Sequence, residues 1–310
     1  MTAWSELVSL VTDPLMQRAL LAALLVGVTA PVIGTYLVQR KLALLGDGIG
    51  HVALTGVALG WLVGSLTGLA PDSLAIPGAV VAALVGAILI ELVRERGRTT
   101  GDVALALLFY GGIAGGVLLI SQAGGTSANL MGYLFGSIST VSWADLGLTV
   151  VLTVLVLVIG VGLRTALFAV SHDEEFARAA GLPVRALNLA IAVIAALTVT
   201  LAMRVVGLLL VSALMIVPVA VAQLVTASFR RTMTLAMVIG AVVCVGGLAI
   251  TYWNDVSPGA TIVVLAIGLY AATSIARPAL ARLRGGDTRA AHDPHPVQDD
   301  DVQLTLGGGR

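Results

Sequence analysis

Asp47 and His51 stand four residues apart within the apolar stretch LLGDGIGHVALTG, residues 44–56. Residues four apart lie on one face of a helix, so the carboxylate and the imidazole can converge on one point. This pair of ligands suits a divalent transition metal such as manganese, zinc or iron. Two ligands do not close a site, but a symmetric dimer supplies four. A weak, shared site also lets an ion leave again.

The position of the pair along its helix makes an unpaired state costly. From Lys41 at the membrane interface, Asp47 lies about 9 Å and His51 about 15 Å along the helix axis. An aspartate at the centre of a membrane helix costs about 2.5–3.5 kcal/mol on insertion scales. We therefore expect the pair to face protein, water or an ion. The alternative is a structural bridge, in which the two side chains satisfy each other and a nearby hydroxyl such as that of Thr55.

The composition of the chain indicates the element that carries this pair. Of its 310 residues, 58% are hydrophobic and 11% are charged, whereas soluble domains contain about 25% charged residues. Several apolar stretches reach the roughly 20 residues that a helix needs to cross a bilayer. They lack the alternation of barrel strands. We predict an all-α, polytopic membrane protein with about nine transmembrane helices, at residues 16–38, 45–69, 75–93, 102–121, 144–169, 184–202, 205–227, 232–252 and 257–276.

The distribution of arginine predicts the topology. Every arginine-rich loop follows an odd-numbered span, and the positive-inside rule places such loops in the cytoplasm. The N-terminus is then outside and the C-terminus cytoplasmic. We predict a membrane domain over residues 1–284 and a disordered, polar cytoplasmic tail over residues 285–310. The net charge of zero gives no indication of nucleic-acid binding.

A second group of residues lies in the loop SHDEEFARAAGLPVRALN, residues 171–188. Three acidic residues, Asp173 to Glu175, favour the start of a helix, and Gly181-Leu182-Pro183 favours its end. We predict one short helix over about 173–180, within a loop over about 171–185. Such a helix suits docking into a groove on a soluble partner. The alternative is a solvated connector.

Two further features concern mechanism. Pro218 lies inside the seventh span, where it removes a helical hydrogen bond and kinks the backbone. That kink suits gating or static packing equally. The only lysine, Lys41, is preceded by no phosphate-binding glycine loop, and no metalloprotease or serine-hydrolase motif is present. We predict a protein that is not an enzyme, so that any ATPase is a separate chain.

Together these motifs resemble the membrane permeases of bacterial ABC importers for manganese, zinc or iron, which work with cluster A-I metal-binding proteins. The resemblance runs over residues 14–276. In chain order, the matching segments are GDGIGHVALTGVALG, TTGDVALALLFYGGIAGGVLL, LMGYLFGSI, SHDEEFARAAGLPV, VVGLLLVSALMIVPVAVA and YWNDVSPGATIVV.

The resemblance implies a homodimeric permease in the bacterial cytoplasmic membrane, with two soluble ATPases beneath it. It also implies an extracytoplasmic binding protein that delivers the ion, and no permanently bound cofactor. Asp47 and His51 would be the metal ligands in the translocation path. Two departures are Thr55, which stands where the family usually has a proline three to four residues after the histidine, and His172, which stands where it commonly has an aromatic residue. The coupling helix to the ATPase would comprise Asp173, Glu174, Glu175, Phe176, Ala177 and Gly181.

Our leading hypothesis is import by alternating access, powered by the separate ATPase. The rival is a secondary transporter in which Asp47 and His51 relay protons or the metal itself. A third interpretation is a sensor or assembly scaffold, for which the pair is only a polar bridge.

Overall fold

The computed structural model describes residues 9–10, 12–69, 73–95, 101–123, 132–136, 142–205, 207–254 and 256–283. Over these residues the chain forms helices and turns and no strand, which confirms the all-α prediction. The predicted tail over residues 285–310 lies outside them. The main helices are α2 (Pro14–Gln39), α3 (Leu45–Thr67), α4 (Ala75–Glu95), α5 (Gly101–Gln122), α7 (Trp143–Gly162), α8 (Arg164–His172), α9 (Glu174–Ala179), α10 (Val184–Val205), α11 (Leu208–Val225), α12 (Phe229–Trp253) and α13 (Pro258–Leu283).

The number of spans differs slightly from the predicted nine. Within the described ranges, eight helices are long and apolar enough to cross a membrane, and the seventh predicted span, over residues 205–227, corresponds to a shorter apolar helix of residues 210–225 in α11. The predicted span over 144–169 is also divided, because the chain leaves helical geometry at Leu163, between α7 and α8. Hydropathy did not reveal this break, because α8 also contains apolar residues, of which Leu167 and Val170 are buried, and so it continues the apolar stretch of α7.

Local sequence sets where the helices begin. Asp13 caps α2 by accepting a hydrogen bond from the Leu15 amide at 2.8 Å, and Pro14 occupies the first turn, where its missing N–H is not needed. α7 begins with a capping box, in which Ser142 and Asp145 each accept a hydrogen bond from the other's backbone amide. These caps satisfy amides that would otherwise be exposed at a helix end.

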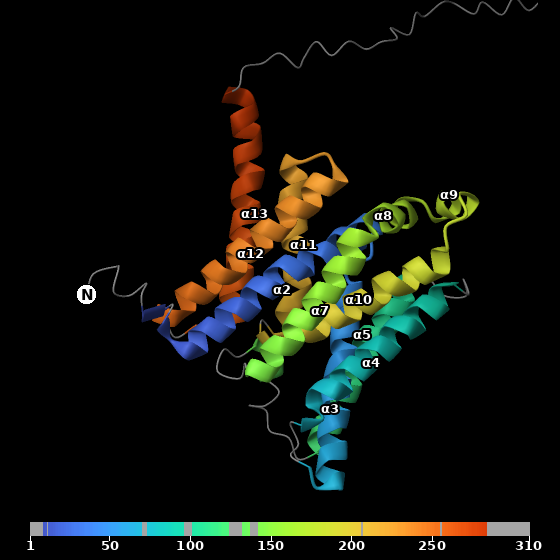
Figure 1. Cartoon of the computed structure of the whole chain (residues 1–310), viewed down its shortest axis with the longest axis vertical. Coiled ribbons are helices and arrows are strands. Elements are labelled where there is room, and N and C mark those ends of the chain that lie inside the picture. Colours follow the sequence, from blue (N-terminus) through green and yellow to red (C-terminus); the bar gives the residue numbers. More distant parts are fainter. Residues whose placement is uncertain are drawn as a thin grey trace, which may run out of the picture.

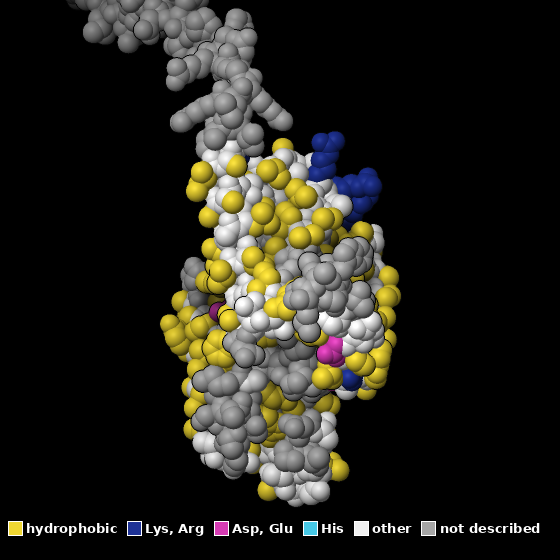
Figure 2. Space-filling model, turned by 90° about the vertical axis from the view of Figure 1, so that its left-hand side faces the viewer, with side chains coloured by type: hydrophobic (Ala, Val, Ile, Leu, Met, Phe, Trp, Pro, Cys, Tyr) yellow, Lys and Arg dark blue, Asp and Glu magenta, His cyan; other side chains and the backbone are white. Residues whose placement is uncertain are grey.

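Helix α2 lies at the centre of the bundle, beside α7, α10 and α12 (Figure 1). Small residues allow this close packing: a Cβ on Gly27 would lie 2.6 Å from the Gly240 carbonyl oxygen on α12. Such approach is the main source of helix association in lipid, where no hydrophobic force drives helices together. The outer surface is correspondingly apolar, and hydrophobic side chains cover the height of the described part of one face (Figure 2).

The arginine-rich connections gather at one end of the bundle, which we call the α9 end. Arg40, directly after α2, contacts Ser171 on α8 and Asn188 on α10. Arg94 near the end of α4 lies within 4.0 Å of Glu174 on α9. Phe229, the first residue of α12, packs against Tyr36 near the end of α2. The loops that share a side in the predicted topology therefore share a side in the fold.

Candidate functional site

Asp47 and His51 lie on α3, with Asp47 in its first turn. The distance from His51 Nε2 to Asp47 Oδ1 is 3.7 Å. The His51 residue is 4% exposed, whereas the side chain of Asp47 is 22% exposed. The predicted convergence on one helical face is confirmed: the His51 side chain is buried in the bundle, and the Asp47 side chain opens toward its surface.

The surroundings of the pair do not form the closed polar bridge of the alternative interpretation. The separation of 3.7 Å is too long for a hydrogen bond. The Thr55 hydroxyl donates to the Gly112 carbonyl at 2.7 Å, and its other contact is the His51 backbone carbonyl. His51 Nδ1 is buried and has no hydrogen-bond partner within the described part of the chain. Asp47 Oδ1 accepts a hydrogen bond from Ser212 of α11 at 3.3 Å.

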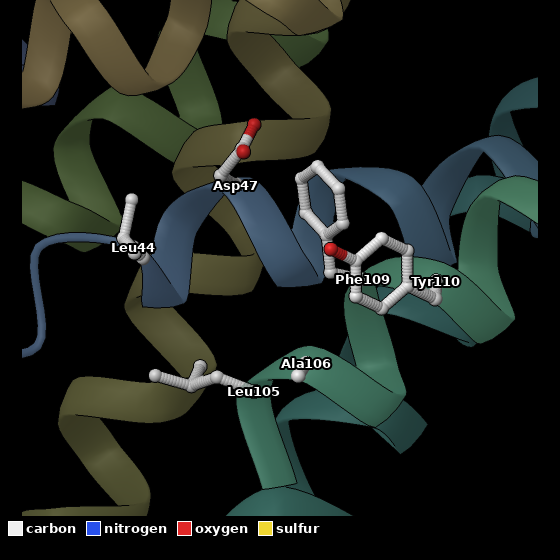
Figure 3. A pocket seen from close by; sticks show the side chains of 6 residues that line it. All are labelled: Leu44, Asp47, Leu105, Ala106, Phe109 and Tyr110. Carbon is white, nitrogen blue, oxygen red and sulfur yellow. The ribbon is translucent and has the colours of Figure 1, made fainter. Parts of the chain in front are cut away.

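A pocket of about 340 Å³ opens beside Asp47. Its lining is apolar apart from the Asp47 carboxylate and the Tyr110 hydroxyl, and Figure 3 shows these side chains with the others that line it. The Phe109 ring, which lines the pocket, packs edge-on against the His51 imidazole with 4.5 Å between ring centroids. An apolar cavity with one carboxylate strengthens the attraction of that carboxylate for a cation, because little water competes. The lining residues are Leu44, Asp47, Leu105, Ala106, Phe109 and Tyr110.

Helix α5 holds the pair in place by an unusually close approach to α3. A Cβ added to Gly112 would lie 2.6 Å from the His51 backbone carbonyl carbon, so only glycine allows this contact. On the other side, a Cβ on Gly50 would lie 2.5 Å from a Leu208 methyl carbon on α11. The backbone that carries His51 is thus clamped between two helices.

The acidic and imidazole side chains at this place number two. Among the residues that the structure describes, no group of three or more His, Cys, Asp or Glu residues is placed to hold a metal ion. If Asp47 and His51 bind a metal, a closed coordination shell needs further ligands from elsewhere.

Comparison with known proteins identifies the family. A sequence model of the ABC 3 transport family matches residues 12–277. The chain belongs to the ABC 3 transport family. The manganese transport system membrane protein MntC of Halalkalibacterium halodurans is 33% identical over 256 residues, which cover 83% of this chain and 85% of that protein. The chelated iron transport system membrane protein YfeD of Yersinia pestis is 30% identical over 255 residues, 81% of this chain and 82% of that protein.

Solved structures agree with this assignment to the ABC 3 family. PsaBC from Streptococcus pneumoniae in complex with Fab superposes with a TM-score of 0.76 at 30% identity, covering 88% of this chain and 95% of that chain. An inward-facing metal-chelate type ABC transporter shares the fold, with a TM-score of 0.65 at 17% identity. This ABC 3 family member has bacterial relatives and eight apolar spans among its described residues, and is a multi-pass protein of the cytoplasmic membrane.

The predicted coupling segment of this ABC 3 protein forms the short helix α9, close to its predicted bounds. Asp173 caps it by accepting a hydrogen bond from the Phe176 amide at 2.9 Å. Gly181 follows the helix with a positive φ of 77°, which glycine adopts without strain. Ala177 is buried against the bundle, whereas Glu175 is exposed and Phe176 is 66% exposed.

The remaining predicted positions have less distinctive surroundings. Pro218 lies inside α11, which continues through it from Leu208 to Val225. His172, one of the two departures from the family pattern, stacks on Phe168 with 5.7 Å between ring centroids. Its Nδ1 lies 3.1 Å from Gln39 Nε2.

Sequence reasoning missed two neighbours of Asp47 and His51, namely Ser212 and Phe109. Ser212 is a lone hydroxyl in an apolar helix, and 165 residues separate it from Asp47. Only the packing of α11 on α3 shows that the two meet. A polar side chain inside an otherwise apolar span is the signal that could have drawn attention to Ser212.

Proposed function

We propose that this chain is the permease subunit of an ATP-driven importer for a divalent transition-metal ion, manganese, zinc or ferrous iron. Asp47 and His51, the metal pair, bind the ion in transit. The observation that carries the proposal is a buried imidazole whose Nε2 lies 3.7 Å from a carboxylate, too far for a direct hydrogen bond, with that carboxylate opening to a pocket. The names of the relatives, a manganese and a chelated iron system, favour the same substrates. Membership of an ABC family argues against the secondary transporter.

The geometry of the pair suits a shared ion. Two ligand atoms that each bind a metal at about 2.1 Å lie roughly 3–4 Å apart, depending on the angle between them. The 3.7 Å between His51 Nε2 and Asp47 Oδ1 falls in that range. The spacing of the two atoms therefore suits a cation bound between them better than a direct hydrogen bond.

A homodimer would complete the site. The outer face of α5 beside the pocket is apolar and exposed, with Leu107 and Tyr110 each 69% exposed. A second copy packed against this face would bring its own Asp47 and His51 toward the same pocket. Four ligands shared between two subunits form a site that separates when the subunits move, and the ion is then released.

Energy would enter through α9. Its exposed Phe176 is an apolar knob on a polar loop and suits a groove on a separate ABC ATPase subunit. The α9 end would then be cytoplasmic, as the arginine distribution predicts, with the N-terminus outside and the C-terminus inside. An extracytoplasmic binding protein would deliver the ion at the opposite end. ATP-driven motion of the ATPases would alternate access to the pair.

The test is uptake into proteoliposomes that contain this chain, its cognate ATPase and metal-loaded binding protein, with manganese, zinc and ferrous iron compared. We expect ATP-dependent uptake of at least one metal, abolished by Asp47→Ala and by His51→Ala while dimer and ATPase still assemble. His172→Ala, a histidine outside the pair, is the matched control for metal binding to the permease alone, because His172 lies in the predicted coupling loop. Uptake that ignores ATP and follows a proton gradient would contradict the proposal, as would full uptake in both variants of the pair.

A further inference from the structure

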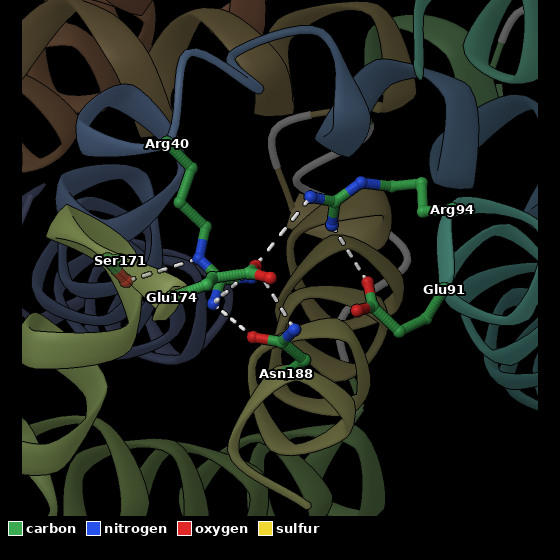
Figure 4. Close-up of polar contacts among 6 residues, drawn as sticks. All are labelled: Arg40, Glu91, Arg94, Ser171, Glu174 and Asn188. Carbon is green, nitrogen blue, oxygen red and sulfur yellow. Dashed lines mark hydrogen bonds and ion pairs between the residues drawn. The ribbon is translucent and has the colours of Figure 1, made fainter. Parts of the chain in front are cut away.

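The α9 end contains a buried polar cluster that the metal pair does not explain (Figure 4). At its centre is Arg40, whose side chain is 5% exposed. The guanidinium donates to Ser171 Oγ at 3.2 Å and to Asn188 Oδ1, and lies 3.9 Å from Glu174 Oε1. One cation at the end of α2 thus joins α8, α9 and α10.

Glu174 is the shared anion of this cluster. Its Oε1 accepts a hydrogen bond from Asn188 Nδ2 at 3.2 Å and lies 4.0 Å from Arg94. Arg94 in turn forms a 2.9 Å ion pair with Glu91 on α4. Two arginines and two glutamates balance, so the cluster needs no external ion. Burial lowers the pKa of Arg40, and the negative charge of Glu174 acts in the opposite direction.

These polar contacts attach α9 to the bundle, together with its short connections to α8 and α10. Of its six residues only Ala177 is buried. A displacement of α9 therefore also displaces Glu174 and acts on Arg40 and Asn188. Glu174 has two cationic partners, and Arg40 is the more deeply buried one, because its side chain is 5% exposed and that of Arg94 is 24% exposed.

Arg40 is also directly connected to the metal pair. Residues 41–44 form a tight turn between Arg40 and α3, in which the Leu42 amide donates to the Leu37 carbonyl at 2.8 Å and the Leu45 amide to the Leu42 carbonyl at 2.9 Å. Asp47 follows within the first turn of α3. This hydrogen-bonded turn is the shortest path along the chain from Arg40 to Asp47.

We propose that Arg40 is a positioning residue for energy coupling: its contacts with Glu174 and Asn188 link α9 through the 41–44 turn to Asp47, so that movement of α9 changes metal access. The inference rests on the proposed function. It adds a named route between the site of ATPase docking and the site of metal binding, two regions that the chain otherwise connects only through helix packing.

The test measures manganese uptake and ATP hydrolysis together in the reconstituted importer. For Arg40→Gln we expect the ATP hydrolysed per manganese transported to rise about tenfold, a coupling effect of ordinary size. Manganese affinity of the permease alone should stay within about twofold, since Arg40 does not touch the pair. Arg40→Lys keeps the charge but not the forked donors, and should restore part of the coupling.

Two further variants separate coupling from folding. The double variant Arg40→Gln, Glu174→Gln removes both charges of this ion pair, so that no charge is left without its partner. It should show the same raised ratio of ATP hydrolysed to manganese transported as Arg40→Gln alone. Lys41→Gln removes the neighbouring, exposed cation from the same turn and should behave as wild type. A wild-type ratio in Arg40→Gln, even with uptake and hydrolysis both reduced, would overturn the inference. Absence of ATP-driven uptake in the wild-type importer would overturn the proposed function, and this inference with it.

Discussion

The metal pair and the Arg40 cluster are both polar groups in an apolar helical bundle, but their hydrogen bonding differs. In the cluster, Arg40, Glu174 and Asn188 each contact at least two other members. In the pair, His51 Nδ1 has no partner in the part of the chain that the structure describes, and its Nε2 stands 3.7 Å from the carboxylate. An imidazole nitrogen and a carboxylate that lie close together in a low-dielectric interior without a direct hydrogen bond favour a cation that binds both.

This contrast predicts opposite consequences for substitution. Removing a member of the satisfied cluster leaves its partners without a hydrogen bond or ion pair. Removing the unsatisfied imidazole of the pair leaves no other group without a hydrogen bond. The effect of each substitution can be compared on a common scale, the free energy of unfolding of the purified permease in mixed micelles. Manganese affinity is measured in parallel.

The largest loss is expected for Arg40→Met. It leaves Glu174 without its most buried cation and Asn188 Oδ1 without its donor, and should cost about 2–3 kcal/mol in the free energy of unfolding. Denaturant titration would measure this loss. Lys41→Met, at the exposed neighbouring position, should stay within about 0.5 kcal/mol. Equal stability of the two variants would show that the cluster contributes nothing to the fold.

The second effect is steric. Gly112→Ala places a methyl group 2.6 Å from the His51 carbonyl carbon, so α3 and α5 must separate, at a cost of about 2 kcal/mol. We expect weaker manganese binding as well, because α5 positions His51 and supplies the Phe109 ring. The matched control is Gly111→Ala, where a Cβ meets nothing within 4 Å. A destabilised Gly111→Ala beside a stable Gly112→Ala would contradict the observed helix contact.

The third prediction concerns the hydrogen bond that Asp47 accepts from Ser212 on α11. Ser212→Ala removes the 3.3 Å contact to Asp47 and should cost at most about 1 kcal/mol in stability. Manganese affinity should fall about tenfold, because a group that orients a ligand is lost. Isothermal titration with manganese would measure it. Ser212→Thr keeps the hydroxyl and should retain most of the affinity; equal losses in both variants would assign Ser212 to packing alone.

The sequence predicted the parts of this molecule that depend on residues close together in the chain. Asp47 and His51 share a helical face by their spacing, and α9 lies between an acidic cap and Gly181, as expected. The division of the span over 144–169 was not predicted, because hydropathy carries no information on the direction of a helix.

Contacts between distant segments could not be predicted either. Ser212 reaches Asp47 from 165 residues away, and Arg40 reaches Asn188 from 148 residues away. In the sequence, Arg40 indicated only a membrane interface, because arginines at the ends of spans usually serve that purpose. Its burial depends on how α8, α9 and α10 close over it, which no local pattern records.

The smallest change in stability is expected for His51→Leu, which tests the contrast most directly. Leucine is close to histidine in size and leaves no buried nitrogen without a partner, so the free energy of unfolding should change by less than about 1 kcal/mol and can rise. Manganese binding should nevertheless be lost. Stability unaffected by removal of a buried polar side chain is typical of a group retained for ligand binding rather than for folding.

His172→Leu is the matched control for the same measurements, since that histidine is exposed and stacks on Phe168 at the α9 end. It should leave manganese affinity unchanged. If His51→Leu instead lost several kcal/mol while manganese binding persisted, His51 would be a structural residue whose partner lies outside the described residues. The contrast between a satisfied cluster and an unsatisfied pair would then fail at its central residue, because the imidazole would be stabilising the fold just as Arg40 does.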